Sequence, residues 1–151
     1  MAIITPFITS DGIVEIYVDN MLKGIVVIDR LNPPYGTALP GGFMDVGESI
    51  EQCLKREMLE EISLDVEIKG LLGIYSDPNR DPRFHTVSAV YICRAEQLPI
   101  AGDDAKTCKV VSLEKLLNEQ FVFDHALIIK DYLAYRQLRS DKDFPSGEEK
   151  D

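Results

Sequence analysis

Three glutamates gather near the end of one predicted helix, and their spacing suits the binding of a divalent cation. Glu57, Glu60 and Glu61 stand three, four and one residues apart, so a helix brings them to one end of the same element. Carboxylates at this spacing repel one another and oppose the helix dipole. A divalent cation offsets the repulsion, and ligation by oxygen atoms alone favours Mg²⁺ or Mn²⁺ over zinc. The alternative is a solvated acidic patch.

The orientation of each glutamate follows from a helical projection, because an α-helix turns by about 100° per residue. Cys53 and Leu54 define the apolar face of the helix, and Glu57 and Glu61 project from the middle of that face. Glu60 lies at its edge. Partly buried carboxylates without a partner are costly or take up protons. This placement favours the metal-binding interpretation over the acidic patch.

The residues before the helix predict how it is positioned. Pro40-Gly41-Gly42 indicates a tight turn where backbone approaches a ligand closely, with a plain turn as the alternative. Ser49 is a good N-cap, and Gln52 three residues later completes a capping box. We therefore expect the helix to run from Ser49 to about Ile62.

The other elements are predicted from apolar runs and turn residues. Strands are expected at residues 2–9, 13–18, 24–29, 66–75, 86–94 and 107–111, and helices at 113–119 and 124–138. Asp11-Gly12 is expected to be a turn between the first two strands. This order of strands, one long helix, strands and then helices indicates a mixed α+β fold rather than a doubly wound one.

Composition limits the class of protein. The 151 residues are 45% hydrophobic and 28% charged, which predicts one soluble domain over residues 1–139, followed by an acidic, disordered tail over residues 140–151. The net charge of −10 argues against nucleic-acid and anionic-membrane partners. The chain has no run long enough to span a bilayer and no basic segment typical of a signal peptide. Three widely spaced cysteines suit a reducing compartment, so we expect a cytoplasmic protein.

The segment from Gly42 to Leu64 resembles the signature of the Nudix hydrolase family, G-x5-E-x7-R-E-U-x-E-E-x-G-U, in which U is aliphatic. The matching positions are Gly42, Glu48, Arg56, Glu57, Met58, Glu60, Glu61 and Leu64. Ser63 departs from the pattern, because the family has a glycine there, whose apparent role is a left-handed helix C-cap. The resemblance implies a Nudix α/β/α sandwich with a mixed sheet.

The resemblance also implies ligands for the metal. Glu57, Glu60 and Glu61 would bind one or more Mg²⁺ ions, with Mn²⁺ as an alternative, and the backbone carbonyl of Gly42 would complete the coordination. Such an ion neutralises phosphate charge and lowers the pKa of bound water, which suits hydrolysis of a diphosphate linkage.

Four further residues receive candidate roles in the same way. Arg56 and Glu48 would form an orienting ion pair, with an ordinary surface salt bridge as the alternative. The general base would be one of the signature glutamates or an acid from a later turn, Asp103 or Asp104. A solvated turn is the alternative interpretation of those two aspartates.

The substrate must be recognised outside the signature. The segment Y-S-D-P-N-R-D-P-R-F-H is similar to a loop of ADP-ribose pyrophosphatase-like Nudix proteins. It suggests that Arg80 and Arg83 contact phosphates and that His85 binds phosphate or positions the substrate. The alternative is a rigid surface turn in which Asp77 and Asp81 pair with the arginines.

These resemblances predict a Mg²⁺-dependent hydrolase that cleaves ADP-ribose to AMP and ribose 5-phosphate. One alternative is a (d)NTP pyrophosphohydrolase that removes oxidised or non-standard nucleotides, and another is a non-catalytic Nudix-fold nucleotide sensor. Phe43, Tyr35 or Phe84 would stack on a base, or else belong to ordinary packing. The partner is expected to be a small nucleotide, and the family resemblance implies a homodimer.

Overall fold

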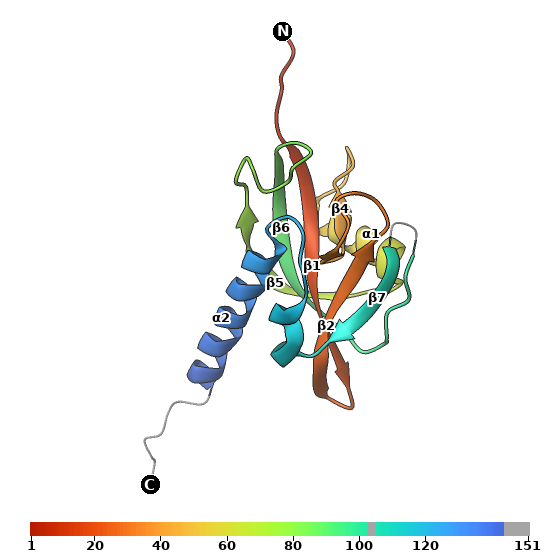
Figure 1. Cartoon of the computed structure of the whole chain (residues 1–151), viewed down its shortest axis with the longest axis vertical. Coiled ribbons are helices and arrows are strands. Elements are labelled where there is room, and N and C mark those ends of the chain that lie inside the picture. Colours follow the sequence, from red (N-terminus) through yellow and green to blue (C-terminus); the bar gives the residue numbers. More distant parts are fainter. Residues whose placement is uncertain (103–104, 144–151) are drawn as a thin grey trace.

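A mixed β-sheet with helices on both faces forms the framework of the computed structural model, which describes residues 1–102 and 105–143 (Figure 1). Seven strands are found in these residues. They are β1 (Phe7–Val18), β2 (Met21–Arg30), β3 (Thr37–Ala38), β4 (Gly41–Phe43), β5 (Glu67–Tyr75), β6 (Thr86–Ala95) and β7 (Ala105–Val111). The helices are α1 (Ile50–Ile62), the 3₁₀ helix η1 (Leu113–Asn118) and α2 (His125–Asp143).

The strand β1 lies at the centre of the sheet. The strand order is β3-β2-β1-β6-β5, with β4 paired to β1 and β7 paired to β2. The pairing of β1 with β6 is parallel, whereas β1 pairs with β2 and with β4 in the antiparallel direction. The predicted α+β class with a mixed sheet is therefore confirmed.

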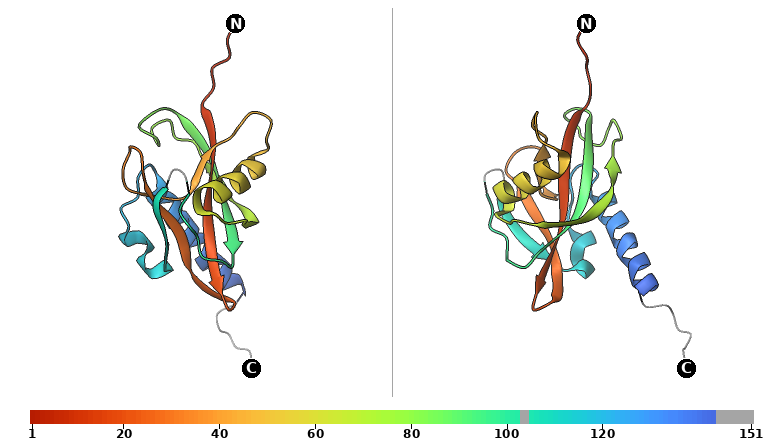
Figure 2. Two further views of the ribbon diagram at one scale, coloured as in Figure 1. Left: turned by 90° about the vertical axis from the view of Figure 1, so that its right-hand side faces the viewer. Right: turned by 180° about the vertical axis from the view of Figure 1, so that it is seen from behind.

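Each face of the sheet packs against different helices. Along β1, Val14 points into a core that includes Leu54 and Met58 of α1. Its neighbour Ile13 points into a second core with Ile128 of α2. This alternation follows from the two-residue period of a strand. Figure 2 shows the resulting layers, with α1 on one side of the strands and η1 and α2 on the other.

The prediction of a turn at Asp11-Gly12 is wrong, because β1 runs without interruption through both residues. The backbone N–H of Gly12 donates to the Pro40 carbonyl at 2.9 Å. A Cβ at position 12 would lie 2.9 Å from the Met58 Sδ atom and 3.3 Å from Leu54 Cδ1. The glycine therefore lets α1 pack closely on the strand rather than reverse the chain.

Both ends of α1 are fixed by specific hydrogen bonds. The predicted capping box is present: Ser49 Oγ accepts from the Gln52 N–H at 3.2 Å, and Gln52 Oε1 accepts from the Ser49 N–H at 2.8 Å. At the other end, Ser63 adopts the left-handed conformation, with φ 61° and ψ 34°. Its hydroxyl donates to the Ile100 carbonyl at 2.9 Å, and the Ile100 N–H donates to the Ile62 carbonyl at 3.0 Å. Serine thus fills the position of the family glycine and ties the chain after β6 to the helix end.

The final helix is longer than expected. It begins at His125, next to the predicted cap Asp124, and continues to Asp143, into the stretch expected to be a disordered tail. The rest of that stretch, residues 144–151, lies outside the described residues. Among the helices of the described chain, none is long and apolar enough to cross a membrane.

Candidate active site

A cleft of about 350 Å³ opens where α1 faces β4, the loop before β6 and the start of α2. Its lining combines acidic side chains from α1 with basic side chains from the opposite wall. The ionisable residues that line it are Asp11, Arg30, Asp45, Arg56, Glu57, Glu61, Arg80, Asp81, Arg83 and His125. Most of the residues predicted for the site therefore meet in one place.

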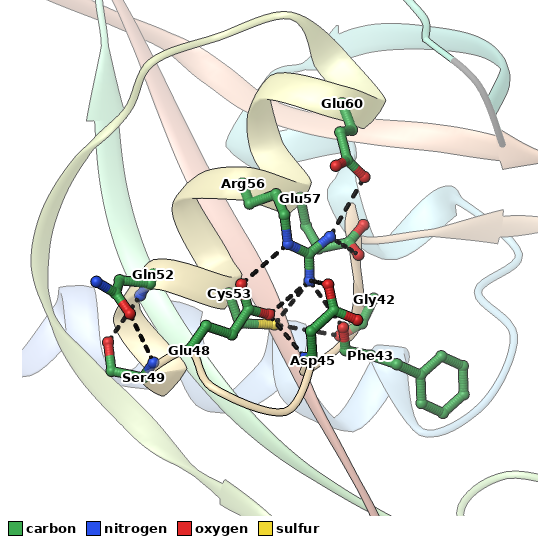
Figure 3. Close-up of polar contacts among 10 residues, drawn as sticks. All are labelled: Gly42, Phe43, Asp45, Glu48, Ser49, Gln52, Cys53, Arg56, Glu57 and Glu60. Carbon is green, nitrogen blue, oxygen red and sulfur yellow. Dashed lines mark hydrogen bonds and ion pairs between the residues drawn. The ribbon is translucent and has the colours of Figure 1, made fainter.

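Arg56 lies at the centre of the acidic wall (Figure 3). Its guanidinium binds Glu48 through two hydrogen bonds, Nε to Oε2 at 3.0 Å and Nη2 to Oε1 at 2.6 Å. The same group contacts Glu57 at 2.9 Å, Glu60 at 3.3 Å and Asp45 at 3.5 Å. Four carboxylates thus share one cation, and Arg56 holds the loop before α1 against the helix.

The Arg56–Glu48 pair stays ionised over a wide pH range. The hydrogen bond from Arg56 is the largest cause that lowers the pKa of Glu48, to about 2. The hydrogen bond to Glu48 raises the pKa of Arg56 in turn. The ion pair predicted from the signature is present, with the two-bond geometry that fixes a carboxylate in orientation as well as in distance.

The three signature glutamates differ in how far they are buried. Glu61 is only 7% exposed, and its Oε1 accepts a hydrogen bond from the Gly41 N–H at 2.8 Å. The side chain of Glu57 is 16% exposed and that of Glu60 51% exposed. The helical projection is therefore confirmed: Glu57 and Glu61 face inward, and Glu60 lies at the edge of the apolar face.

Two of the three predicted metal ligands face the cleft together. Glu57 and Glu61 line it, whereas the Glu60 carboxylate lies against Arg56 outside it. Within residues 1–102 and 105–143, no three Asp, Glu, His or Cys side chains converge as the ligands of a metal would. The expected cluster of three is thus divided into a pair in the cleft and one carboxylate beside it.

Gly42 brings the backbone of β4 against this pair. A Cβ at position 42 would collide with the carboxylate of Glu57, so only glycine allows such close approach. The carboxylates of Glu57 and Glu61 and the carbonyl of Gly42 are hard oxygen donors at one edge of the cleft. This donor set fits a hard divalent cation such as Mg²⁺ or Mn²⁺.

Arg80 is buried in a closed ion pair. Its side chain is 4% exposed, and its guanidinium donates to Asp124 at 2.7 and 2.9 Å and to Thr86 Oγ1 at 2.8 Å. The surface-turn alternative named Asp77 and Asp81 as partners of the arginines, but the carboxylate that binds Arg80 is Asp124. These three hydrogen bonds are all made within the protein, and they support a structural role for Arg80 at the wall of the cleft.

Arg83 reaches the cleft more openly. Asp81 fixes its guanidinium by two hydrogen bonds, at 3.0 Å to Oδ1 and 2.8 Å to Oδ2, so one of the two predicted internal pairs is present. The same guanidinium lies 5.2 Å from the ring centre of Phe84, 5.3 Å from that of Phe123 and 6.0 Å from that of Phe43. A cation held among aromatic rings is pre-oriented for a ligand.

Of the remaining predicted site residues, only some line the cleft. Phe43 lines the cleft and its ring packs 5.9 Å from that of Phe84. His85 is not among the lining residues, and its Nε2 lies 3.0 Å from the Ser76 carbonyl oxygen. Asp104, and Asp103 beside it, lie outside the described residues.

Among the cleft residues that sequence reasoning missed are Asp11, Arg30, Asp45, Phe123 and His125. Asp11 was assigned to a turn, and Arg30 carries no motif. Phe123 has a φ of 58°, an uncommon conformation for a bulky residue that often marks a functional site. His125 had a usable signal, because the chain holds only two histidines and this one begins a helix.

His125 is buried and its ring orientation is fixed. Its Nδ1 accepts a hydrogen bond from the Leu39 backbone N–H at 3.0 Å, and its ring centre lies 5.2 Å from that of Phe123. Burial is the largest cause that lowers the pKa of His125, to about 4. At neutral pH the imidazole is therefore uncharged.

Comparison with known proteins agrees with this geometry. The family model of the NUDIX domain matches residues 9–132. The ADP-ribose pyrophosphatase of Methanocaldococcus jannaschii is 42% identical over 134 residues, which cover 87% of this chain and 75% of that protein.

Two solved structures extend the comparison. The NUDIX domain of Shewanella oneidensis NrtR, complexed with ADP ribose, has a TM-score of 0.75 at 26% identity, covering 90% of each chain. A bifunctional NMN adenylyltransferase/ADP ribose pyrophosphatase of Francisella tularensis, complexed with AMP and Mn ion, has a TM-score of 0.70 at 28% identity. That match covers 87% of this chain and 42% of the other. The chain therefore belongs to the Nudix family, as a pyrophosphohydrolase that acts on phosphorus-containing anhydrides.

Proposed function

We propose that the substrate is ADP-ribose, hydrolysed in a divalent-metal-dependent reaction to AMP and ribose 5-phosphate. One observation carries the proposal: a single cleft holds the inward-facing pair Glu57 and Glu61 on one wall and Arg83 among aromatic rings on the other. An acidic wall suits a metal ion, and the opposite wall suits an anionic nucleotide. The name of the M. jannaschii relative, an ADP-ribose pyrophosphatase, supports the choice of substrate.

Glu57, Glu61 and the carbonyl of Gly42 would hold the ion, with Mg²⁺ as the expected metal and Mn²⁺ as the alternative. When bound, such an ion neutralises diphosphate charge and lowers the pKa of a coordinated water. Glu60 lies next to these ligands on α1 and would complete the set if its side chain turned from Arg56. The oxygen-only donor set supports this assignment.

The chain's own groups position the reaction. Arg56 and Glu48 hold the β4–α1 loop against the helix, so the acidic wall keeps its shape when substrate binds. Arg83 would orient the diphosphate by its charge, and Phe43 would stack on the base. The general base would be a glutamate of α1, Asp103 or Asp104. The pH–rate profiles of the Asp103→Asn and Asp104→Asn variants separate these choices, since only loss of the base removes the acidic limb.

The competing function is a binding module that recognises ADP-ribose without cleaving it. The similarity to the NrtR domain complexed with ADP ribose favours this alternative over other non-enzymatic roles. The signature glutamates argue against it, because simple binding requires neither a buried carboxylate pair nor a fixed arginine.

A product analysis tests the proposal. The purified protein is incubated with Mg²⁺ and, in separate reactions, with ADP-ribose, NADH, dinucleoside polyphosphates and oxidised dNTPs, and the products are resolved by chromatography. We expect AMP and ribose 5-phosphate from ADP-ribose, and no turnover after chelation of the metal. Cleavage of 8-oxo-dGTP with ADP-ribose left intact would instead make the protein a (d)NTP pyrophosphohydrolase. Calorimetric binding of ADP-ribose without turnover on the whole panel would favour the binding module.

We also propose that the protein works in the cytoplasm as a homodimer. The thiols of Cys53, Cys93 and Cys108 are free, which suits a reducing compartment. Sedimentation equilibrium over a range of protein concentrations tests the dimer, and a constant monomer mass would exclude it.

A further inference from the structure

One buried side chain in the cleft uses only half of its hydrogen-bonding capacity. His125, the first residue of α2, is 3% exposed and lines the cleft. Its Nδ1 accepts from the Leu39 N–H at 3.0 Å. Among residues 1–102 and 105–139, no group forms a hydrogen bond with the other ring nitrogen, Nε2.

The bond to Leu39 fixes the tautomer of the ring. A backbone N–H can only donate, so Nδ1 must carry a lone pair and no proton. A neutral imidazole with an unprotonated Nδ1 carries its proton on Nε2. Burial opposes the charged form, and the N-terminus of α2 does so as well, because the helix dipole is positive there. His125 therefore presents Nε2 as a hydrogen-bond donor without positive charge.

A buried donor without an acceptor is costly, so its retention calls for a partner. The surroundings limit what that partner is. The carboxylate of Asp11 lines the same cleft, where it accepts a hydrogen bond from Ser88 Oγ and acts on the ring of His125 through its charge. Arg80, Arg30 and Asp81 also act on the ring through their charges, and Arg80 is paired with Asp124. A neutral donor close to a carboxylate suits an uncharged acceptor much better than a phosphate.

We propose that the Nε2–H of His125 donates a hydrogen bond to an uncharged acceptor atom of the bound nucleotide, in its sugar or its base. His125 is thus a specificity-determining residue of the cleft. It does not take part in the chemical step. The proposal deepens the function proposed above and rests on it for the class of ligand. The ring is held for this task by the Leu39 bond on one nitrogen and by the Phe123 ring beside it.

Two substitutions at this position separate the substrate contact from the structural one. In His125→Asn, the side-chain oxygen can take the place of Nδ1 and keep the Leu39 bond, but nothing replaces the Nε2–H. We expect KM for ADP-ribose to rise about tenfold, the value of one neutral hydrogen bond, while kcat and Tm change little.

In the reciprocal variant His125→Gln, the amide can reach toward the position of Nε2 but the Leu39 N–H loses its acceptor. That variant is expected to have a lower Tm than the wild type and a KM closer to the wild-type value.

A measurement on the wild-type protein tests the same contact without relying on turnover. With only two histidines in the chain, a ¹⁵N–¹H spectrum of the imidazoles contains two residues. We expect one of them to carry its proton on Nε2 at pH 7, to vanish in His125→Asn, and to shift on addition of ADP-ribose. Titration with AMP and with ribose 5-phosphate separately shows which half of the substrate carries the acceptor.

The outcomes also distinguish this proposal from the proposed function. If ADP-ribose is not cleaved but shifts the Nε2–H signal of His125, the substrate assignment fails and the contact stands. If ADP-ribose is cleaved while the signal and the KM of His125→Asn are unchanged, the contact is overturned and the function stands. A proton found on Nδ1, or a signal that neither ADP-ribose, AMP nor ribose 5-phosphate shifts, overturns the proposal whatever the enzyme cleaves.

Discussion

The two walls of the cleft carry their charges in different ways. On the α1 wall, four carboxylates share the single guanidinium of Arg56, so negative charge is in excess. On the opposite wall, Arg80 and Arg83 each have a carboxylate of their own, Asp124 for Arg80 and Asp81 for Arg83. An unbalanced wall gains stability from a bound cation, whereas a balanced wall is already stable without a ligand. The first wall is thus suited to a metal ion, and the second to holding Arg83 and the aromatic rings in place for an anionic nucleotide.

The largest expected effect belongs to the α1 wall. Glu61→Gln keeps an oxygen that can accept the Gly41 N–H but removes the charge that a cation requires. We expect kcat to fall about a thousandfold, the upper range for loss of one group that stabilises transition-state charge, with the fold retained. Steady-state kinetics with ADP-ribose and Mg²⁺ measure this loss, and circular dichroism checks the fold. Activity within a few-fold of wild type would contradict the metal-binding role of this wall.

On the opposite, balanced wall of Arg80 and Arg83, removing the charge of a carboxylate should lower stability rather than catalytic activity. Asp124→Asn leaves the buried guanidinium of Arg80 without its counter-charge, which should lower the free energy of unfolding by about 3 kcal/mol or more. Urea denaturation measures this change, and KM for ADP-ribose is expected to stay within a few-fold.

A matched control is Glu96→Gln, which removes the same kind of charge from the exposed pair with Arg94. Its effect should stay below about 1 kcal/mol. If Asp124→Asn were as mild as this control, the pairing with Arg80 would not be a structural support.

Lowering the pH should also affect groups on the two walls differently. His125 has its pKa lowered from 6.5 to about 4, so between these values the unfolded chain binds a proton that the folded chain does not. The free energy of unfolding should therefore fall as pH drops from about 6.5 to 4, by at most ~3 kcal/mol. Glu48, with a pKa of about 2, stays ionised throughout this range.

The comparison for this prediction is His125→Asn, which has no titrating ring. The charged groups that act on the histidine, Asp11, Arg80, Arg30 and Asp81, remain in the variant. Its unfolding free energy should depend less on pH between 6.5 and 4 than that of the wild type. Parallel pH profiles of the two proteins would show that His125 is not the titrating group.

The smallest effect is expected for Arg83, the more exposed cation of the balanced wall. Arg83→Ala removes a charge beside the aromatic rings and should raise KM for ADP-ribose about tenfold, since one charge-assisted contact is lost, with kcat little changed. Arg94→Ala, on a strand away from the cleft, serves as the control and should leave KM unchanged. An unchanged KM in Arg83→Ala would assign the whole loop to structural support.

The two walls also differ in how far the sequence predicts them. The acidic wall is local: its helix limits, its capping box and the inward pair Glu57 and Glu61 follow from spacing within about one helix, and all are found in the structure. The Arg56–Glu48 pair, which spans only eight residues, was implied by the family resemblance and is also present. Interactions within the helix depend on regular helix geometry, which spacing alone determines.

The balanced wall depends on contacts between distant segments. Asp124 binds Arg80 across 44 residues, and Leu39 binds His125 across 86 residues. No local pattern pairs such residues, because the sheet topology brings them together. The prediction of a turn at Asp11-Gly12 is wrong for a related reason. The local preference for a turn is overridden because β1 is buried between β4, β6 and α1.

Gly12 has a consequence for the depth at which the acidic pair lies. Because Gly12 has no side chain, the side chains of Met58 and Leu54 from α1 rest directly on the main chain of β1 at this point. Glu57 and Glu61 move with α1 as one body. The position of both carboxylates relative to the cleft therefore depends on the packing of α1 on Gly12, a residue that does not line the cleft. A single methyl group at position 12 would meet the flexible Met58 side chain first, so it would change this packing from the interior of the protein rather than from its binding surface.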